Sequence, residues 1–396
     1  MVDQELRRAR AGLTQVIEPA DALGVVGAQA WGPQRLLEII EGATPSQQDW
    51  KALTEHDPND EELAQKIRRN LGEAIGRWRR RNKYLKPDEA LGYIARIGGR
   101  FIIPEDKQWP AALADLGVTE PLGLWLLGNG DIPSAETTLG LVGSREATYY
   151  GETATKMLAI KARQKGITVL SGGAYGIDAH AHRHALAVQG QGVPTVGVLA
   201  GGLDRLYPAG NTDLLREITR DGVLITEMPP GMRPNRYRFL NRNRLIAALS
   251  AVTIVVEARY RSGALNTANH AHELGRLVGA IPGPIQVPTS AGCHRLIKET
   301  PTMLIDDPAD LDSLFGEPFR TDTTVAYLEP SRDHDVLNVE ELLVLEALPV
   351  RQRTTIEHLC GITGLAVPSI TGILTKLERH ELAEQEAGMW RKQRNT

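Results

Sequence analysis

The sequence predicts an α/β protein built on a doubly wound, mostly parallel sheet, with a helical domain before it and a winged helix after it. Between residues 139 and 282, short runs of apolar residues alternate with helical stretches. Strands that are apolar throughout are typical of a parallel sheet covered by helices on both faces. Roughly the first hundred residues show only helical patterns, and roughly the last sixty show helices followed by a hairpin pattern.

The composition is that of a soluble globular protein. The chain has 396 residues, of which 42% are hydrophobic and 24% are charged, and its formal net charge is −4. At about 150 residues per domain, this length corresponds to two or three domains. The two cysteines cannot form a disulfide framework, and neither a membrane-spanning apolar run nor the apolar core of a signal peptide is found. We therefore expect a cytoplasmic protein that does not enter membranes.

Residues 1–100 are predicted to form a small helical domain similar to sterile-alpha-motif or helix-hairpin-helix units. Residues 22–41 contain a Gly-Pro turn that leads into an amphipathic helix, and residues 61–81 form a second, longer helical pattern. The segment 66–86 holds nine lysines and arginines against one acid, Glu73. This segment is either a solvated helix face or a non-specific phosphate-binding surface.

Residues 101–316 are assigned to the α/β domain. Its predicted strands are 139–143, 167–171, 194–200, 222–226, 251–257 and 277–282, and its predicted helices are 150–165, 177–189, 211–221, 241–250 and 265–276. Ligands of such sheets bind outside the carboxyl ends of the strands, where the strand order reverses. The loops that follow the strands are therefore the candidate binding site.

A stretch rich in Pro, Asp and Thr predicts a linker over residues 317–334, and residues 335–396 predict a winged-helix domain. The pattern is a helix over 339–348, a short helix over 355–361, a turn with Gly361 and Gly364, a longer helix over 367–378 and a hairpin-like tail. Winged helices bind duplex DNA or proteins. Both possibilities stay open, because this domain is not notably basic.

Four loops that follow predicted strands contain glycine or serine. They hold Gly143, Ser144 and Arg145; Ser171, Gly172, Gly173 and Gly176; Gly201 and Gly202; and Ser262 and Gly263. Glycines let the backbone approach an anion closely, and a helix N-terminus behind such a loop offers free N–H groups to a phosphate. The alternative is that these glycines only make tight turns. No nucleotide cofactor is expected, because the chain lacks the P-loop sequence and the acid that would hold a ribose.

An arginine cluster occupies residues 233–261, with seven arginines against one acid, Glu257. Residues 236–239 alternate arginine and aromatic residues, so an extended conformation would place the guanidinium groups and the rings on opposite sides. Interleaved rings and cations suit single-stranded nucleic acid, whose bases stack while its phosphates pair with the cations. The alternatives are that Phe239 fills the core and that the arginines pair internally with Glu227 and Glu257.

A helix is expected to follow this segment, with Asn241 as its N-cap. Arg242 and Arg244 would then lie in the first helical turn. Cations there oppose the helix dipole, at a cost of roughly 0.3–1 kcal/mol each. A bound anion at this helix end would offset that cost.

The sequence shows no catalytic or metal site. Among His180, His182 and His184, only His180 and His184 share a helix face, and no acidic or cysteine ligand lies close in sequence. The serines lack the G-x-S-x-G pattern of hydrolases, and no pair of carboxylates is suited to acid–base catalysis. We therefore predict a binding protein without metal or cofactor.

Taken together, the motifs resemble the DNA-processing protein DprA (Smf) family. The resemblance covers most of residues 100–300 and rests on GSR followed by Tyr150 and Gly151, SGGAYGIDAHAHRHAL, GVLAGGLDRLYPAGN, RFLNRNRLIAALS, and VVEARYRSGALNTA with the later IPGP. It implies an extended Rossmann-like fold, binding of single-stranded DNA without catalysis, loading of the RecA recombinase during natural transformation, and a homodimer formed through the α/β domain.

Transferred residue by residue, the resemblance implies a phosphate pocket and a rim that stacks bases. The pocket is expected to contain Gly143, Ser144, Arg145, Ser171, Gly172, Gly173, Gly176, Arg242, Asn243, Arg244, Ser262 and Gly263, and the rim Tyr237, Arg238 and Phe239. The main alternative is a nucleotide 5′-monophosphate phosphoribohydrolase of the lysine-decarboxylase-like family, which shares the G-S-R and G-G-x-x-G loops. Its P-G-G-x-G-T-x-x-E motif is absent after Glu257. A nucleotide sensor that signals through the winged helix is a third possibility.

Overall fold

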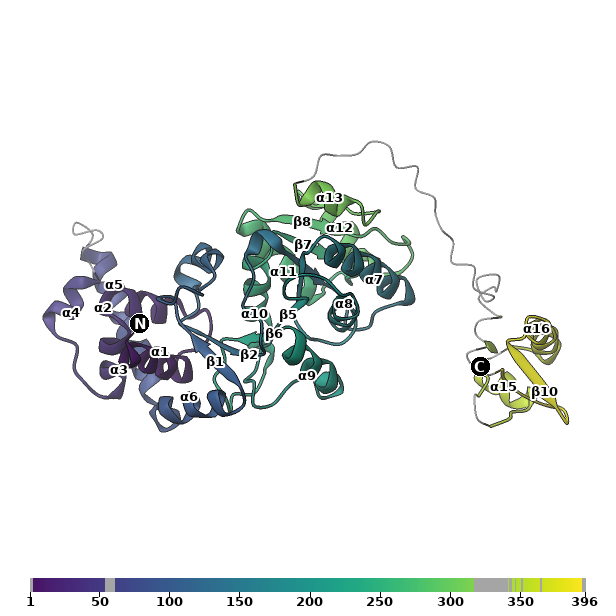
Figure 1. The fold of residues 1–396 in the computed structure, drawn as a ribbon, viewed down its shortest axis with the longest axis horizontal. Coiled ribbons are helices and arrows are strands. Elements are labelled where there is room, and N and C mark those ends of the chain that lie inside the picture. Colours follow the sequence, from purple (N-terminus) through teal and green to yellow (C-terminus); the bar gives the residue numbers. More distant parts are fainter. Residues whose placement is uncertain are drawn as a thin grey trace. The chain divides into compact units, whose positions relative to one another are not determined.

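The structure, a computed structural model, describes residues 3–53, 61–316, 341, 344–345, 347–349, 352–363 and 365–393, with the backbone alone for 61–68. The chain forms two compact units, Met1–Phe319 and Arg320–Thr396 (Figure 1). The predicted linker, most of the first predicted winged-helix helix and Gly364 lie outside the described residues.

The first unit contains a long series of helices and a single sheet. Its helices are α1 (Gln4–Val16), α2 (Ala22–Trp31), α3 (Pro33–Glu41), α4 (Gln47–Ala52), α5 (Glu61–Arg79), α6 (Pro87–Arg96), α7 (Tyr149–Gln164), α8 (Ile177–Leu186), α9 (Thr212–Asp221), α10 (Arg236–Ala248), α11 (Gly263–Glu273), α12 (Ala291–Glu299) and α13 (Asp310–Leu314). Its strands are β1 (Gly99–Ile102), β2 (Leu124–Leu127), β3 (Thr138–Val142), β4 (Thr168–Ser171), β5 (Thr195–Val198), β6 (Val223–Thr226), β7 (Val252–Val255), β8 (Leu277–Ala280) and β9 (Met303–Leu304).

The N-terminal helices pack around an apolar core of their own. Gly32, with a φ of 81°, separates α2 from α3, and Pro33 occupies the first position of α3, as the Gly-Pro turn predicts. Buried Leu13, Leu36 and Trp78 belong to the core beneath these helices. β1 runs across residue 100, and the helices before it form one compact unit with the sheet. The domain boundary predicted at residue 100 therefore stays a prediction.

Part of the basic segment 66–86 already has partners within the protein. Arg79 donates hydrogen bonds to the carbonyls of Ile39 and Ala43, and Arg81 pairs with Glu18 at 2.9 Å. The side chains of 66–68 lie outside the described residues. This contact pattern favours a structural role for the two arginines that have partners.

The predicted doubly wound parallel sheet is confirmed. The strand order is β1-β2-β6-β5-β4-β3-β7-β8-β9, and the strands from β6 to β9 in this order are parallel. Chain order reverses at β3: β4, β5 and β6 extend to one side of it, and β7, β8 and β9 to the other. The antiparallel strands β1 and β2 and the short edge strand β9 were not predicted.

Helices cover both faces of the sheet (Figure 1). Leu158 of α7 and Ala181 of α8 belong to one buried cluster, with Leu141 and Val169 of the strands. The helices α10, α11 and α12 contribute to a different cluster. Each fully buried aliphatic side chain contributes roughly 1.5–3 kcal/mol, so the two layers fix the strand ends and the loops that follow them.

The second unit contains α15 (Ile356–Thr363), α16 (Val367–Arg379) and an antiparallel hairpin of β10 (Ala383–Glu386) and β11 (Met389–Lys392). Thr354 forms a β-bridge with Trp390, and Leu359 and Leu374 are buried against that tryptophan's cluster. This order matches the pattern read from the sequence, and the assignment as a winged helix stays a prediction. No single described helix is long and apolar enough to cross a bilayer. The α15–α16 pair, which is bent by 107°, meets the requirements of a membrane span in length and composition only.

Candidate nucleic-acid interface

A cavity of about 980 Å³ opens where the strand order reverses, at the carboxyl ends of β3 and β7. Its wall is formed by the loop after β3, which holds Gly143, Ser144 and Arg145, and by the first residues of α11. The first two turns of α10 complete it. The cavity thus lies at the position where doubly wound sheets bind their ligands, and it is called the switch-point pocket below.

The switch-point pocket is rich in arginine. Five arginines and two acids line it: Arg145, Arg236, Arg242, Arg259 and Arg261, with Glu146 and Asp178. Arg259 pairs with Glu146 at 2.9 Å, and both side chains are exposed. Arg145, Arg236 and Arg261 are exposed and form no ion pair among the residues that the structure describes. The pocket therefore has an excess of positive charge that the protein itself does not neutralise.

Arg242 forms the floor of the pocket. Its side chain projects from α10, is buried, and donates a hydrogen bond to the carbonyl of Val198. Burial lowers the pKa of Arg242 to about 10, and the nearby Asp178 opposes this shift. Burial in turn raises the pKa of the Asp178 carboxyl. The Nε of Arg242 has no hydrogen-bond partner among the described residues, so this cation retains an unsatisfied donor.

The loop after β4 lines the pocket only through Ala174 and Asp178, and its glycines support the site from behind. A Cβ on Gly172 would collide with the Arg242 guanidinium, and one on Gly176, where φ is 72°, would collide with the backbone of Ser144 and Arg145. Ser171 is buried and donates to a β3 carbonyl. The expectation that this loop contributes residues 171–173 and 176 to the pocket is therefore wrong. Its backbone amides at Gly172 and Ala174 face the carboxylate of Asp178, so the anion they bind belongs to the protein.

Arg244 does not line the pocket either, which corrects a second expectation. Both terminal nitrogens of Arg244 lie 2.6 Å from the carboxylate of Glu227, and the Arg244 side chain is only 4% exposed. It also donates to the carbonyl of Thr119. The alternative of internal pairing with Glu227 thus holds for this arginine. Glu257 pairs with no arginine in the part of the chain that the structure describes; it accepts hydrogen bonds from the backbone and hydroxyl of Thr148 instead.

The helix α10 begins earlier than predicted. Its N-cap is Asn235, whose side chain accepts a hydrogen bond from the backbone of Arg238 at 2.9 Å. Residues 236–239 therefore form the first helical turn and not an extended segment, and Asn241 lies inside the helix. Asn is a common N-cap residue, but the alternation of arginine and aromatic residues over 236–239 was interpreted only for an extended conformation.

This earlier start separates the three expected rim residues. Tyr237 is exposed and lies outside the switch-point pocket, and Arg238 forms a bidentate ion pair with Glu18. Of the three expected rim residues, Phe239 is the one that lines the pocket, where it lies beside the guanidinium groups of Arg145 and Arg242. The expected rim role is therefore wrong for Arg238, whereas that of the exposed Tyr237 stays a prediction.

A second aromatic ring, which was not among the expected site residues, also lines the pocket. Tyr207 is 50% exposed, and its ring centroid lies 6.0 Å from that of Phe239. It belongs to the segment between β5 and α9, whose motif was noted without a role being given to the ring. The other expected pocket residues, Asn243, Ser262 and Gly263, line the cavity, and Ser262 caps α11.

Comparison with known proteins identifies the family. A family model described as DNA recombination-mediator protein A matches residues 100–315, which include strands β2 to β9, most of β1 and the whole pocket. The chain belongs to this family. Among its relatives, a DprA-type protein of Mycobacterium tuberculosis is 43% identical over 76% of this chain and 79% of its own length. Protein Smf of Synechocystis is 31% identical over 77% of this chain and 83% of its own length.

A solved structure of the same family supports the fold. The X-ray structure of DNA processing protein A from Streptococcus pneumoniae superposes with a TM-score of 0.53 and 26% identity, covering 76% of this chain and 100% of that one. The chain is accordingly a DNA-processing recombination mediator by family. The residues that would perform this function are the subject of the proposal below.

Proposed function

We propose that the chain binds single-stranded DNA, with the phosphates of the strand held in the switch-point pocket. The observation behind this proposal is the charge of that pocket. Arg145, Arg236 and Arg261 face it without an ion pair among the described residues, although the whole chain has a net charge of −4. Clustered cations in a cleft attract polyanions, and phosphate contacts supply most of the affinity of non-specific nucleic-acid binding.

The backbone around the pocket suits close approach of a phosphate. Gly143 lies in the wall, and Gly263 begins α11 with nothing within 4 Å of the place where a Cβ would be. The first N–H groups of a helix carry partial positive charge and have no partner within the helix. A phosphate at the start of α11 would therefore meet backbone donors as well as the side chain of Arg261.

The aromatic rings favour an unpaired strand over a duplex. Tyr207 and Phe239 lie beside the cations, and rings stack on bases only where those bases are not paired within a helix. Each stacked base contributes ~1–3 kcal/mol. A duplex would be limited to phosphate contacts in the same pocket, so we expect it to bind more weakly.

The experiment that tests this proposal is a titration of labelled single-stranded and duplex oligonucleotides at several salt concentrations. The variants are Arg145→Ala, Arg236→Ala and Arg261→Ala. Each should weaken single-strand binding and reduce the slope of log affinity against log salt by ~0.7, the value for one lost contact with a single strand. Arg216→Ala is the control, because Arg216 on α9 is exposed and lies outside the pocket. If all three variants keep the affinity and the salt slope of the wild type, the assignment is refuted.

We further propose that the bound strand is passed to RecA in the cytoplasm. The support is the family description, that of a recombination mediator. The test measures the DNA-dependent ATPase of RecA on single strands coated with single-strand-binding protein. The wild type should shorten the lag in RecA assembly, whereas Arg145→Ala should not. A lag that the wild type leaves unchanged would oppose this step without affecting the DNA-binding proposal.

We also propose a homodimer formed at the β9 edge of the sheet. β9 is the last strand in the sheet order, and Leu277, Met303 and Leu304 on this side are 46%, 40% and 48% exposed. An exposed apolar edge strand is a template for pairing with another chain. A second copy of the chain would cover it and bury these side chains.

We propose no catalytic step for the pocket. Glu257, the acid that follows β7, is 3% exposed, and its carboxylate accepts hydrogen bonds from Thr148 and Thr289. It is therefore not available as a base toward a nucleotide in the pocket. Incubation with AMP tests this point: release of free adenine at ordinary enzymatic rates would favour the phosphoribohydrolase alternative.

A further inference from the structure

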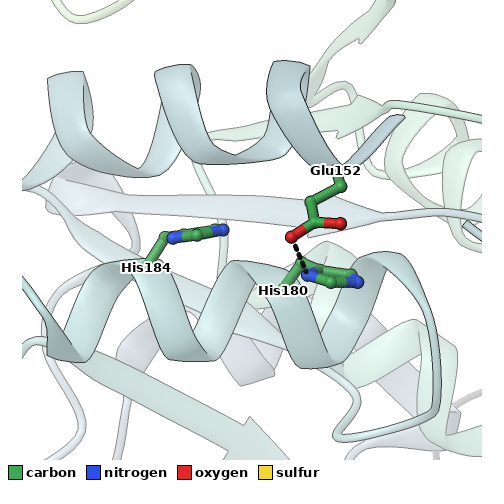
Figure 2. A group of neighbouring side chains, drawn as sticks. All are labelled: Glu152, His180 and His184. Carbon is green, nitrogen blue, oxygen red and sulfur yellow. Dashed lines mark ion pairs between the residues drawn. The ribbon is translucent and has the colours of Figure 1, made fainter. Parts of the chain in front are cut away.

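Two helices bring three metal-ligating side chains together outside the switch-point pocket. Glu152 lies in the first turn of α7, and His180 and His184 lie one turn apart on α8 (Figure 2). One ligand atom from each residue lies within 4.8 Å of the other two. No metal is expected from the sequence alone, because no acidic ligand lies close to these histidines in sequence. That reason is wrong, because Glu152 reaches the histidines from the neighbouring helix.

The three side chains surround an open position. The Nδ1 of His180 lies 3.5 Å from an oxygen of Glu152, which is too long for a good hydrogen bond. The rings of His180 and His184 are nearly parallel, with an interplanar angle of 19° and centroids 6.2 Å apart. Figure 2 shows the ring of His184 reaching along α8 toward Glu152. Its Nε2 is buried and has no hydrogen-bond partner among the described residues.

The donor set has the composition of a transition-metal site. Two imidazoles and one carboxylate, completed by water, are the ligands of many tetrahedral zinc sites, and imidazole also suits Ni²⁺ and Co²⁺. An imidazole must be neutral to bind a metal. Lys156 and Arg183 are the nearby cations that oppose a bound metal, and the carboxylate of Glu152 offsets part of their charge.

We propose that Glu152, His180 and His184 bind one divalent cation of the Zn²⁺ class. The cation would connect α7 to α8 directly. The loop that holds Arg145 leads into α7, and Asp178 in the first turn of α8 faces the floor of the pocket. A cation between the two helices would therefore stabilise one wall of the switch-point pocket. The site itself uses none of the residues proposed to contact DNA, so its existence does not depend on that function.

The experiment uses the full-length chain without a histidine tag, freed of metal by a chelator and then titrated with Zn²⁺ and with Co²⁺. Calorimetry should give one equivalent of Zn²⁺ per chain with a micromolar dissociation constant, and Co²⁺ should develop the visible absorption of a tetrahedral site. His180→Ala, His184→Asn and Glu152→Gln should each weaken binding by roughly tenfold or more. The control is His270→Ala, because His270 also lies 3.2 Å from a glutamate, Glu273, but belongs to no group of three metal-ligating side chains among the described residues.

Thermal unfolding provides a second readout and a check that the variants fold. Without metal, the wild type and all variants should unfold at similar temperatures. Zn²⁺ should raise the unfolding temperature of the wild type and of the control His270→Ala, but not that of the three ligand variants. The proposal is overturned if the wild type takes up no stoichiometric Zn²⁺ below millimolar concentration. It is also overturned if a folded double variant, His180→Ala with His184→Asn, binds as tightly as the wild type.

Discussion

The guanidinium carbon of Arg145 lies 5.1 Å from the centroid of the Phe239 ring, and that of Arg242 lies 6.0 Å from the same centroid. The ring thus lies beside both an exposed cation and a buried one. Contacts of this kind stabilise by ~0.5–2 kcal/mol, more where the cation is desolvated. Their consequence is a ring of fixed orientation beside an unpaired cation, which is the combination that a base and its phosphate require.

Replacement of this ring should weaken DNA binding without changing its salt dependence. Phe239→Leu keeps an apolar side chain but removes the stacking surface, so we expect a loss of ~1–3 kcal/mol in single-strand affinity. The salt slope should stay unchanged, because no phosphate contact is removed. Fluorescence anisotropy at several salt concentrations measures both quantities.

The matched control for this change is Tyr93→Leu. Tyr93 forms a comparable contact with Arg96, at 5.8 Å, on a helix that does not line the pocket. Its loss should leave DNA affinity unchanged. Equal affinities of Phe239→Leu and the wild type would show that the ring only fills space beneath the cations.

The buried pair of Arg244 and Glu227 should determine stability and not DNA contact. Removal of one partner leaves the other charged and buried, and such changes cost about 3–5 kcal/mol. We therefore expect Arg244→Met to lower the free energy of unfolding by about that amount in urea titrations. Arg244→Met combined with Glu227→Leu should recover most of it, because no unpaired charge remains.

The outcome that would contradict this assignment is specific. If Arg244→Met folds with wild-type stability but loses ~0.7 of the salt slope, Arg244 contacts phosphate, as the sequence first suggested. A conformational change that releases Arg244 from Glu227 would then be required.

The sheet could be predicted because each parallel strand is apolar throughout and is followed by a helix. This pattern is local, so the strands from β3 to β8 were recognised together with the loops that form the pocket. The outer strands lack it. Leu124–Leu127 is an apolar run as well, but it pairs antiparallel with β6 and has no crossover helix of its own to mark it.

The roles of individual arginines could not be predicted, because they depend on distant partners. Arg242 and Arg244 are two residues apart in one helix, yet one forms the pocket floor and the other pairs with Glu227 of a different loop. Their spacing places them on different sides of α10, and only the packed structure shows what each side meets. The same reason applies to Glu152, which lies on α7 and reaches His180 on the neighbouring helix α8.

Acid should destabilise the fold through His182, a fully buried residue of α8. Its Nδ1 donates to the hydroxyl of Thr195 at 2.7 Å, because that hydroxyl donates its own hydrogen to the carbonyl of Val169. Burial, with smaller effects of Arg242 and Arg183, lowers the pKa of His182 to about 3 from 6.5. The unfolded chain therefore takes up a proton below about pH 6.5 that the folded chain refuses, and stability falls as the pH falls toward 3.

This linkage corresponds to a loss of about 2 kcal/mol between pH 7 and pH 5. Urea unfolding at both pH values measures it, and His182→Gln should remove most of the difference while it keeps a donor toward Thr195. His358→Gln serves as the control, because His358 is exposed on α15. An equal pH dependence in His182→Gln and the wild type would assign the acid sensitivity to other groups.

The proposed dimer can be separated from DNA binding by one charge at the sheet edge. Leu304 on β9 pairs in register with Ala280 of β8, and its side chain is 48% exposed. A lysine there would have to be buried in any dimer that covers this edge, whereas it is solvated in a monomer. We therefore expect Leu304→Lys to be monomeric by sedimentation analysis at concentrations where the wild type is dimeric. Ile97→Lys, at a 37% exposed apolar residue just before β1 at the opposite end of the sheet order, should remain dimeric. Because β9 does not line the switch-point pocket, the salt slope per chain should be the same for Leu304→Lys as for the wild type. A wild type that is monomeric at all concentrations, or a dimeric Leu304→Lys, would exclude this edge as the interface.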